Sequence, residues 1–176
     1  FGLSDRYFRQ LALENVMTKN LFLAVPALVL SLSTSAQAFE AGSADINPNG
    51  TIAQKFAFNG FGCTGENVSP AIHWKSAPVG AKSFAVMVHD PDAPTGGAGF
   101  WHWVVVDIPG THLGLAKGAG TADGKALPAA ARQINTDFGT PGWGGPCPPA
   151  GDKAHRYNFT VYALKVEKLN LAPDAT

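Results

Sequence analysis

The sequence predicts a mainly β domain, and three observations lead to this prediction. Short segments rich in β-branched and aromatic residues recur along residues 39–176, and turn residues separate them. Several of these segments place apolar side chains at every second position, which is the period of a strand with one buried face. No long segment shows the three- and four-residue apolar spacing of an amphipathic helix.

Four segments are expected to form strands. The first alternates only weakly, the second places Phe84, Val86 and Val88 on one face, the third is almost continuously apolar, and the fourth alternates again. In chain order these segments are residues 51–58, 82–90, 100–108 and 157–166. Residues 114–133 have room for a helical turn, but their glycines disfavour a longer helix. The 20 Gly and 13 Pro of the chain predict structured loops, on which function usually resides.

The first 38 residues are expected to lie outside the folded domain. From Met17 the chain has one Lys, then an apolar run, then the small-x-small pattern Ala36-Gln37-Ala38. This order is typical of a secretory signal peptide, and the run is shorter than the roughly 20 residues that span a bilayer. We therefore expect cleavage after Ala38 and a periplasmic or secreted domain with no integral membrane association. An N-terminal anchor that is never cleaved is the alternative.

The predicted organisation has three parts. Residues 1–16 precede a plausible start at Met17 and are interpreted as an upstream extension that is not native. Residues 17–38 form the signal peptide, and residues 39–176 form one domain, since a chain of this length suits a single core.

Charge and motifs argue against several classes of protein. Lys plus Arg and Asp plus Glu both number 13, and no basic run could follow a phosphate backbone, so nucleic acid is not an expected partner. The common motifs of hydrolases, phosphate loops, zinc proteases and dithiol enzymes are missing. Asp90, His102 and His155 offer metal-ligand chemistry, but no short-spaced ligand pair accompanies them. No metal or cofactor is therefore expected.

The two cysteines are expected to form a disulfide. Cys63 and Cys147 both lie in turn-rich segments, and an exported protein meets an oxidising compartment. A bridge between them would close a long loop. Two free thiols are the alternative, and a catalytic cysteine is disfavoured because His155, across a proline-rich turn, is the only nearby base.

Three polar clusters interrupt the apolar strands, each at a strand end. Asp90 and Asp92 leave the second segment, His102 enters the third, and His155 and Tyr157 enter the fourth. If these strands are neighbours, the clusters meet at one end of the sheet and form a small pocket of acceptors, donors and aromatic walls. Prolines stiffen the rims because each fixes its own backbone angle and restricts the preceding residue. They are Pro91, Pro94, Pro146, Pro148 and Pro149.

Each of these residues also has a structural explanation. His102 lies between two tryptophans and suits a core histidine bonded to a backbone group. Asp90 precedes a proline and is a common turn starter, and Asp152 suits a solvated turn. Arg156 is expected to point away from His155 and pair at the surface. Trp143 suits a pocket wall and a loop anchor equally well.

The combined motifs resemble those of the phosphatidylethanolamine-binding protein family, in particular its bacterial branch labelled Raf-kinase-inhibitor-like. The resemblance rests on DPDAP at residues 90–94, FWHWVVVDIP at 100–109 and GPCPPAGDKAHRYNFTVYAL at 145–164. It implies a large antiparallel sheet packed on a smaller sheet, with short helices and an anion-binding pocket at one end. It also implies that a C-terminal helix and a last strand, which family members carry, are missing here.

The resemblance assigns the ligand-binding residues by position. They are Asp90, Pro94, His102, Pro149, His155 and Tyr157, while Asp92 is expected to support its loop. Both imidazoles are expected to donate N–H groups to the anion, and charge assistance strengthens such bonds.

The expected function is that of an exported, non-catalytic binding protein for phosphate, a phosphorylated headgroup or a similar small anion. One alternative is a regulator or inhibitor of a protein partner such as a protease or kinase. A second is a hydrolase of low activity, in which His102 or His155 acts as general base and Asp90 orients it.

Overall fold

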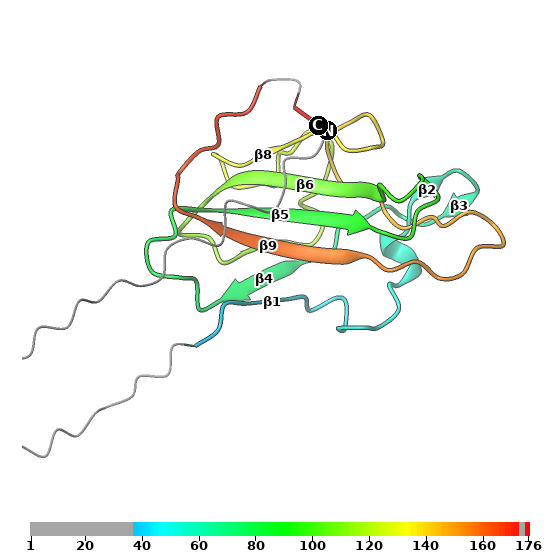
Figure 1. Cartoon of the computed structure of the whole chain (residues 1–176), viewed down its shortest axis with the longest axis horizontal. Coiled ribbons are helices and arrows are strands. Elements are labelled where there is room, and N and C mark those ends of the chain that lie inside the picture. The colour runs from blue at the N-terminus through cyan, green and yellow to red at the C-terminus, as the bar shows by residue number, and fades with distance from the viewer. Residues whose placement is uncertain (1–36, 173–174) are drawn as a thin grey trace, which may run out of the picture. The chain divides into compact units, whose positions relative to one another are not determined.

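The computed structural model describes residues 37–172 and 175–176, so the predicted upstream extension and all but the last two residues of the signal peptide lie outside the described residues. The described chain forms short β-strands and one 3-10 helix (Figure 1). In chain order the elements are β1 (Glu40–Gly42), η1 (Gln54–Phe56), β2 (Asn59–Gly60), β3 (Cys63–Thr64), β4 (Ile72–Lys75), β5 (Ser83–Asp90), β6 (Phe100–Pro109), β7 (Gly114–Leu115), β8 (Arg132–Gln133) and β9 (Asn158–Leu164).

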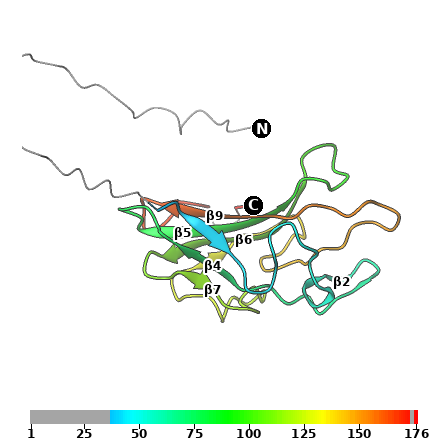
Figure 2. The ribbon, with the colours of Figure 1, turned by 90° about the horizontal axis from the view of Figure 1, so that it is seen from below.

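The strands form a large sheet, a small sheet and a hairpin. The large sheet has the order β8-β6-β5-β9, the small sheet has the order β1-β4-β7, and β2 pairs with β3. All pairings are antiparallel. Seen from below, β4 and β7 lie beneath the layer of β5, β6 and β9 (Figure 2). The predicted large antiparallel sheet packed on a smaller one is therefore confirmed.

The main core lies between the two sheets. Phe84, Val86 and Val88 of β5 are fully buried there, as the alternation of this segment predicts. They pack with side chains from β6, from the small sheet and from two loops. The remaining buried members of this core are Phe56, Ile72, Trp74, Trp103, Val105, Ile108, Leu115, Ala119 and Trp143.

A second apolar cluster covers the opposite face of the large sheet. It joins Ala85 of β5 and Val104 and Val106 of β6 to Ile134, and Leu169 and Ala175 pack against it. Because β6 buries side chains on both faces, its sequence is almost continuously apolar instead of alternating, with His102 and Asp107 as its two polar residues.

Asp107 holds the C-terminal segment on this second face. It lies in β6, where a register shift against β5 marks a β-bulge, and its φ of 57° is in the left-handed region, which Asp tolerates better than most residues. Its buried carboxylate accepts hydrogen bonds from Arg132 Nε at 2.8 Å and from the Leu169 backbone N–H at 2.7 Å. The carboxylate thus joins β8 and the segment after β9.

Two expectations about individual elements differ from the structure. Residues 51–58 do not form a strand: they contain η1, whose Phe56 enters the core, and Phe56 O accepts from Trp143 Nε1 at 3.1 Å. The apolar spacing of this segment reflects the burial of the Phe56 ring and not the buried face of a strand. Residues 114–133 begin with β7, end with β8 and form turns between them, with no helix in that range. No helix among the described residues has the length and hydropathy that crossing a bilayer requires.

The predicted disulfide is present. Cys63 of β3 is bonded to Cys147, 84 positions later, and their Cα atoms are 5.9 Å apart. The bridge fastens the β2–β3 hairpin to the loop that leads into β9. The same loop contacts the segment before β2 through a hydrogen bond from the Phe58 N–H to Pro146 O at 3.1 Å.

Replacing both cysteines, Cys63→Ser with Cys147→Ser, should lower the free energy of unfolding by on the order of 4 kcal/mol, because the unfolded chain regains the entropy of a long open loop. Urea denaturation under non-reducing conditions measures this loss. The urea midpoints of the wild type and the double variant should become equal when a reductant is added to the wild type. Equal midpoints without reductant would show that the bridge contributes no stability.

Candidate functional site

The antiparallel pairing brings the three polar clusters together. Asp90 at the end of β5 pairs with Phe100 at the start of β6, and His89 pairs with Asn158 at the start of β9. The end of one strand thus meets the starts of its two neighbours. His102 is the third residue of β6, and His155 and Tyr157 immediately precede β9. The His102 and Tyr157 rings are 5.1 Å apart and nearly perpendicular. The structure thus gathers Asp90, His102, His155 and Tyr157 at one end of the large sheet.

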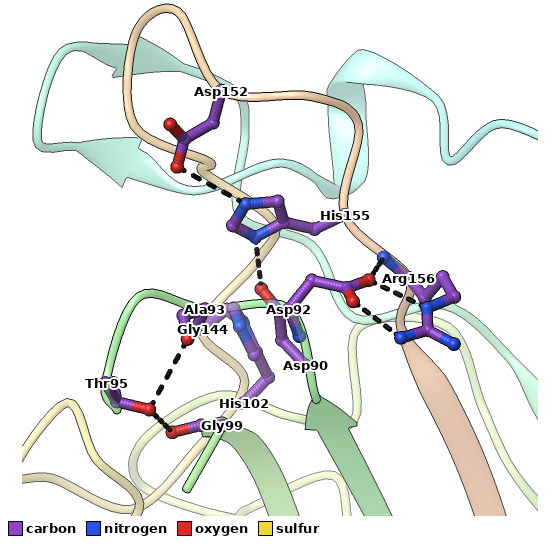
Figure 3. A network of polar contacts seen from close by, with 10 residues as sticks. All are labelled: Asp90, Asp92, Ala93, Thr95, Gly99, His102, Gly144, Asp152, His155 and Arg156. Atoms are coloured by element: carbon purple, nitrogen blue, oxygen red, sulfur yellow. Dashed lines mark hydrogen bonds and ion pairs between the residues drawn. The ribbon is translucent and has the colours of Figure 1, made fainter. Parts of the chain in front are cut away.

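Asp90 uses both carboxylate oxygens within the protein. Oδ1 accepts from the Asp92 backbone N–H at 2.8 Å, which closes a turn after β5, and Oδ2 lies 2.7 Å from His155 Nδ1 (Figure 3). The side chains of His155 and Asp90 are only 6% and 4% exposed. Because an ionised carboxylate only accepts, Nδ1 of His155 carries the proton, and Nε2 is left for other partners. Asp90 therefore fixes both the orientation and the tautomer of His155.

Asp152 is a member of the site that the sequence reasoning assigned to a solvated turn. Its Oδ2 lies 3.6 Å from His155 Nε2, and its side chain is partly exposed. His155 is thus placed between two carboxylates, as Figure 3 shows. The three-residue spacing of Asp152 and His155 is visible in the sequence as a possible ion pair, but it is the conformation of the loop that brings the two side chains together.

Asp92 and Arg156 fasten the two site loops to each other. The Asp92 carboxylate accepts three hydrogen bonds from Arg156. They come from the guanidinium Nε at 2.9 Å, from a terminal guanidinium nitrogen at 2.6 Å and from the backbone N–H at 2.8 Å. These bonds hold the pKa of the Asp92 carboxyl well below its usual range. Arg156 is exposed and points away from His155, as the strand alternation predicted, and Asp92 contacts the loop in the supporting way that was expected.

His102 is nearly buried, with 4% of its surface exposed, and Nδ1 lies 2.6 Å from Gly144 O. A carbonyl oxygen only accepts, so Nδ1 is the donor. Burial lowers the pKa of His102 below its usual 6.5, although the bond to Gly144 opposes this effect. His102 is therefore a neutral imidazole at neutral pH, and its Nε2 accepts a hydrogen bond. It donates from Nε2 only when it becomes charged, which refines the expectation of two donating imidazoles.

Tyr157 contributes a hydroxyl that stays protonated. Burial, followed by the negative charges of Asp90 and Asp92, raises the pKa of Tyr157 well above its usual range. Two buried side-chain polar atoms lack a hydrogen-bond partner in the described part of the chain: Trp74 Nε1, in the core between the sheets, and the Tyr157 hydroxyl, at the site. His155 and Tyr157 also line a groove of about 1010 Å³ beside β9, together with Pro146 and Pro148.

A family model described as phosphatidylethanolamine-binding protein matches residues 42–176. The chain belongs to the phosphatidylethanolamine-binding protein family. YbcL of Escherichia coli strain K12 is 48% identical over 151 residues, which are 86% of this chain and 82% of YbcL. The crystal structure of YbcL, described as a new member of the mammalian family, matches with a TM-score of 0.73 and 50% identity over 76% of this chain and 80% of that one. A Mycobacterium tuberculosis relative that carries the lipoprotein name LppC is 45% identical over 117 residues, 66% of this chain and 52% of its own.

Family membership confirms the resemblance and the β fold. The other predicted residues, Pro94, Pro149 and Trp143, differ in where the structure places them. Pro94 and Pro149 are exposed on the two loops that Asp92 and Arg156 join. Trp143 is buried in the core of this family member against Trp103 and donates to Phe56 O, so it is a loop anchor. Among residues 37–172 and 175–176, no three His, Cys, Asp or Glu side chains are arranged to hold a metal ion.

The stability of this family member should fall as the pH is lowered below about 6.5. Since the pKa of folded His102 is depressed, the unfolded chain takes up a proton that the folded chain resists, and stability is lost by up to about 1.4 kcal/mol per pH unit until folded His102 titrates. Urea denaturation from about pH 8 to about pH 5 measures the slope. His102→Gln should flatten it, whereas His112→Gln, at an exposed position, should leave it unchanged. Equal slopes in wild type and His102→Gln would contradict the assignment.

Proposed function

We propose that the protein binds phosphate or a phosphorylated headgroup at the site formed by Asp90, His102, His155 and Tyr157. The observation that carries this proposal is the buried, unpartnered hydroxyl of Tyr157 among the described residues. A buried donor without a partner costs about 1–3 kcal/mol, so buried polar groups are nearly always paired. A hydroxyl that stays protonated beside two imidazoles suits an anionic oxygen as its partner.

An anion that binds the Tyr157 hydroxyl from the side of His155 Nε2 would take the place of the exposed Asp152 carboxylate, whose Oδ2 lies 3.6 Å from that nitrogen. The Asp90 carboxylate would repel an anion, but His155 Nδ1 and the Asp92 N–H already occupy its oxygens. Because His155 Nδ1 already donates to Asp90, a second bond from Nε2 to an anionic oxygen needs the doubly protonated ring, and such a bond is charge-assisted. The Tyr157 hydroxyl adds a neutral bond.

His102 adds a preference for an anion that still carries a proton. Its neutral Nε2 accepts, so it suits a P–OH group better than a bare oxygen. Phosphate monoesters lose their second proton near pH 6. A singly protonated phosphate could thus donate to His102 while it accepts from His155 and Tyr157.

Binding without turnover is the reaction class that these contacts support best. Three of the four imidazole nitrogens of the site contact the Asp90 and Asp152 carboxylates and the Gly144 carbonyl, which leaves His102 Nε2 as the candidate general base. The hydroxyl of the site, that of Tyr157, has a raised pKa and is a poor nucleophile for such a base to activate. The signal-like segment, the disulfide and the lipoprotein name of LppC support an exported location, periplasmic or secreted.

Tyr157→Phe should weaken phosphate and phosphoethanolamine binding by roughly tenfold, the value of one hydrogen bond, without lowering the free energy of unfolding. The substitution removes an unpaired donor from the free protein, so its stability should stay equal or rise. Isothermal titration calorimetry and urea denaturation measure the two effects. Tyr162→Phe, on an exposed part of β9, is the matched control. Equal phosphate affinity in wild type and Tyr157→Phe would sink the proposal, and release of inorganic phosphate from phosphoethanolamine would show a hydrolase instead.

Phosphate affinity should rise on mild acidification, from about pH 8 to about pH 6, because phosphate takes up a proton near pH 6 and the neutral Nε2 of His102 accepts a hydrogen bond from the resulting P–OH group. Calorimetric titrations across this range give the profile, and His155→Ala should bind weakly at every pH. A flat profile in the wild type would contradict the role of His102 as the acceptor for a protonated phosphate.

A further inference from the structure

Four phenylalanines form a continuous row of rings from His102 to the protein surface, and we call this row the phenylalanine shelf. Phe100 and Phe138 lie against His102, with ring centroids 5.3 and 5.5 Å from the imidazole. Phe58 lies 4.8 Å from Phe138, and Phe61 lies 5.3 Å from Phe58. The three inner rings are half-buried, whereas Phe61 is 82% exposed.

The backbone holds Phe61 in a conformation that suits other residues better. Phe61 and Gly62 are the two central residues of the β2–β3 turn and have φ angles of 53° and 90°. Two consecutive positive φ values define the mirror-image hairpin turn, in which Asn, Asp or Gly is preferred at the first position. A bulky residue there is a steric outlier, and such strain clusters at ligand sites.

Neither the strain nor the exposure of Phe61 helps the chain to fold. The turn that carries Phe61 is nevertheless held in place, because Cys63 directly follows it and is bonded to Cys147 in the loop that leads to His155. On the inner side, a Cβ at Gly144 would overlap the Phe138 ring, so Phe138 lies directly on the backbone whose carbonyl accepts the hydrogen bond from His102 Nδ1. The shelf therefore meets the anion site at His102, whose ring also lies 5.1 Å from that of Tyr157.

We propose that the phenylalanine shelf binds a planar aromatic group of the same ligand whose anionic group is held by His155 and Tyr157. This inference rests on the proposed function and names the ligand class, an aromatic phosphate or a similar aromatic anion. Aromatic rings prefer offset-stacked and edge-to-face contacts at 4.5–7 Å, and the shelf rings already pair in both ways, with Phe58 stacked on Phe61 and Phe100 edge-on to Phe138.

A membrane surface fits the shelf less well than a small aromatic molecule does. Only Phe61 projects into solvent, and the other three rings run inward toward His102. The hairpin sequence NGFGCTGE, residues 59–66, contains no Lys or Arg to attract anionic lipid, and its one charged residue, Glu66, is acidic.

The test compares phenyl phosphate, cyclohexyl phosphate and inorganic phosphate on the full chain by calorimetry. The two organic anions have rings of similar size, but only one ring is aromatic. Phenyl phosphate should bind roughly three- to tenfold tighter than cyclohexyl phosphate. Phe61→Asn should reduce that preference to less than about twofold, keep inorganic phosphate binding, and raise the melting temperature by roughly 2–8 °C because Asn suits the turn. Val79→Asn, at a fully exposed position of the β4–β5 turn at the other end of β5, is the control and should keep the preference.

The outcomes separate the two proposals. Equal affinity for phenyl and cyclohexyl phosphate, or a preference that survives Phe61→Asn, overturns the aromatic ligand class, while saturable binding of inorganic phosphate in the same series leaves the anion site standing. Failure of all three anions to bind overturns both. Sedimentation with phosphatidylethanolamine and phosphatidylglycerol vesicles completes the series: vesicle binding that Phe61→Asn abolishes, with no aromatic preference, would assign the shelf to a membrane instead.

Discussion

The Asp90 carboxylate is the group on which the arrangement of the site depends. One oxygen ends β5 by accepting the Asp92 N–H, and the other orients His155, which lies 65 positions later. A single side chain thus sets a local turn and a long-range contact. Because its partners come from two different loops, the position of His155 is defined relative to the end of β5 and not only by its own loop.

The contacts around Asp90 repeat this pattern of loop joined to loop. Arg156 binds Asp92 across the same two loops, and the Cys63–Cys147 bridge fixes the second loop to the β2–β3 hairpin. The carbonyl of Gly144 accepts a hydrogen bond from His102 and so joins β6 to that loop as well. Such networks make a rigid site because each member is held from two sides, and rigid placement lowers the entropy lost when a ligand binds.

The sequence predicted the long strands and the meeting of the polar clusters better than it predicted the loops. Residues 82–90, 100–108 and 157–166 are long enough for a two-residue period to be read, and β5, β6 and β9 occupy them within two residues at each end. The strands β2, β3, β7 and β8 contain two residues each, too few for any period. The segment 51–58 was mistaken for a strand because one buried ring, Phe56, produced an apolar spacing that a helical turn explains.

The site shows the same division between strand and loop. Asp90, His102, His155 and Tyr157 could be identified because each lies within three residues of a strand end. Asp152 and Phe61 could not, because their positions depend on loop and turn conformations that no local pattern specifies. The role of His102 also required coordinates, since only the Gly144 carbonyl reveals which ring nitrogen is free.

The long sequence separation of these contacts has a consequence for how the chain folds. The bonds that complete the site join residues 64, 65 and 84 positions apart, and β5 pairs with β9 across the same interval. Chains dominated by distant contacts fold slowly, because each long loop must be closed before any contact compensates for the lost entropy. The inner strand β5 is synthesised well before β9, so one of its edges stays unpaired until β9 arrives. During that interval Val86 and Val88 have no strand neighbour on that side, and an unpaired edge is open to aggregation.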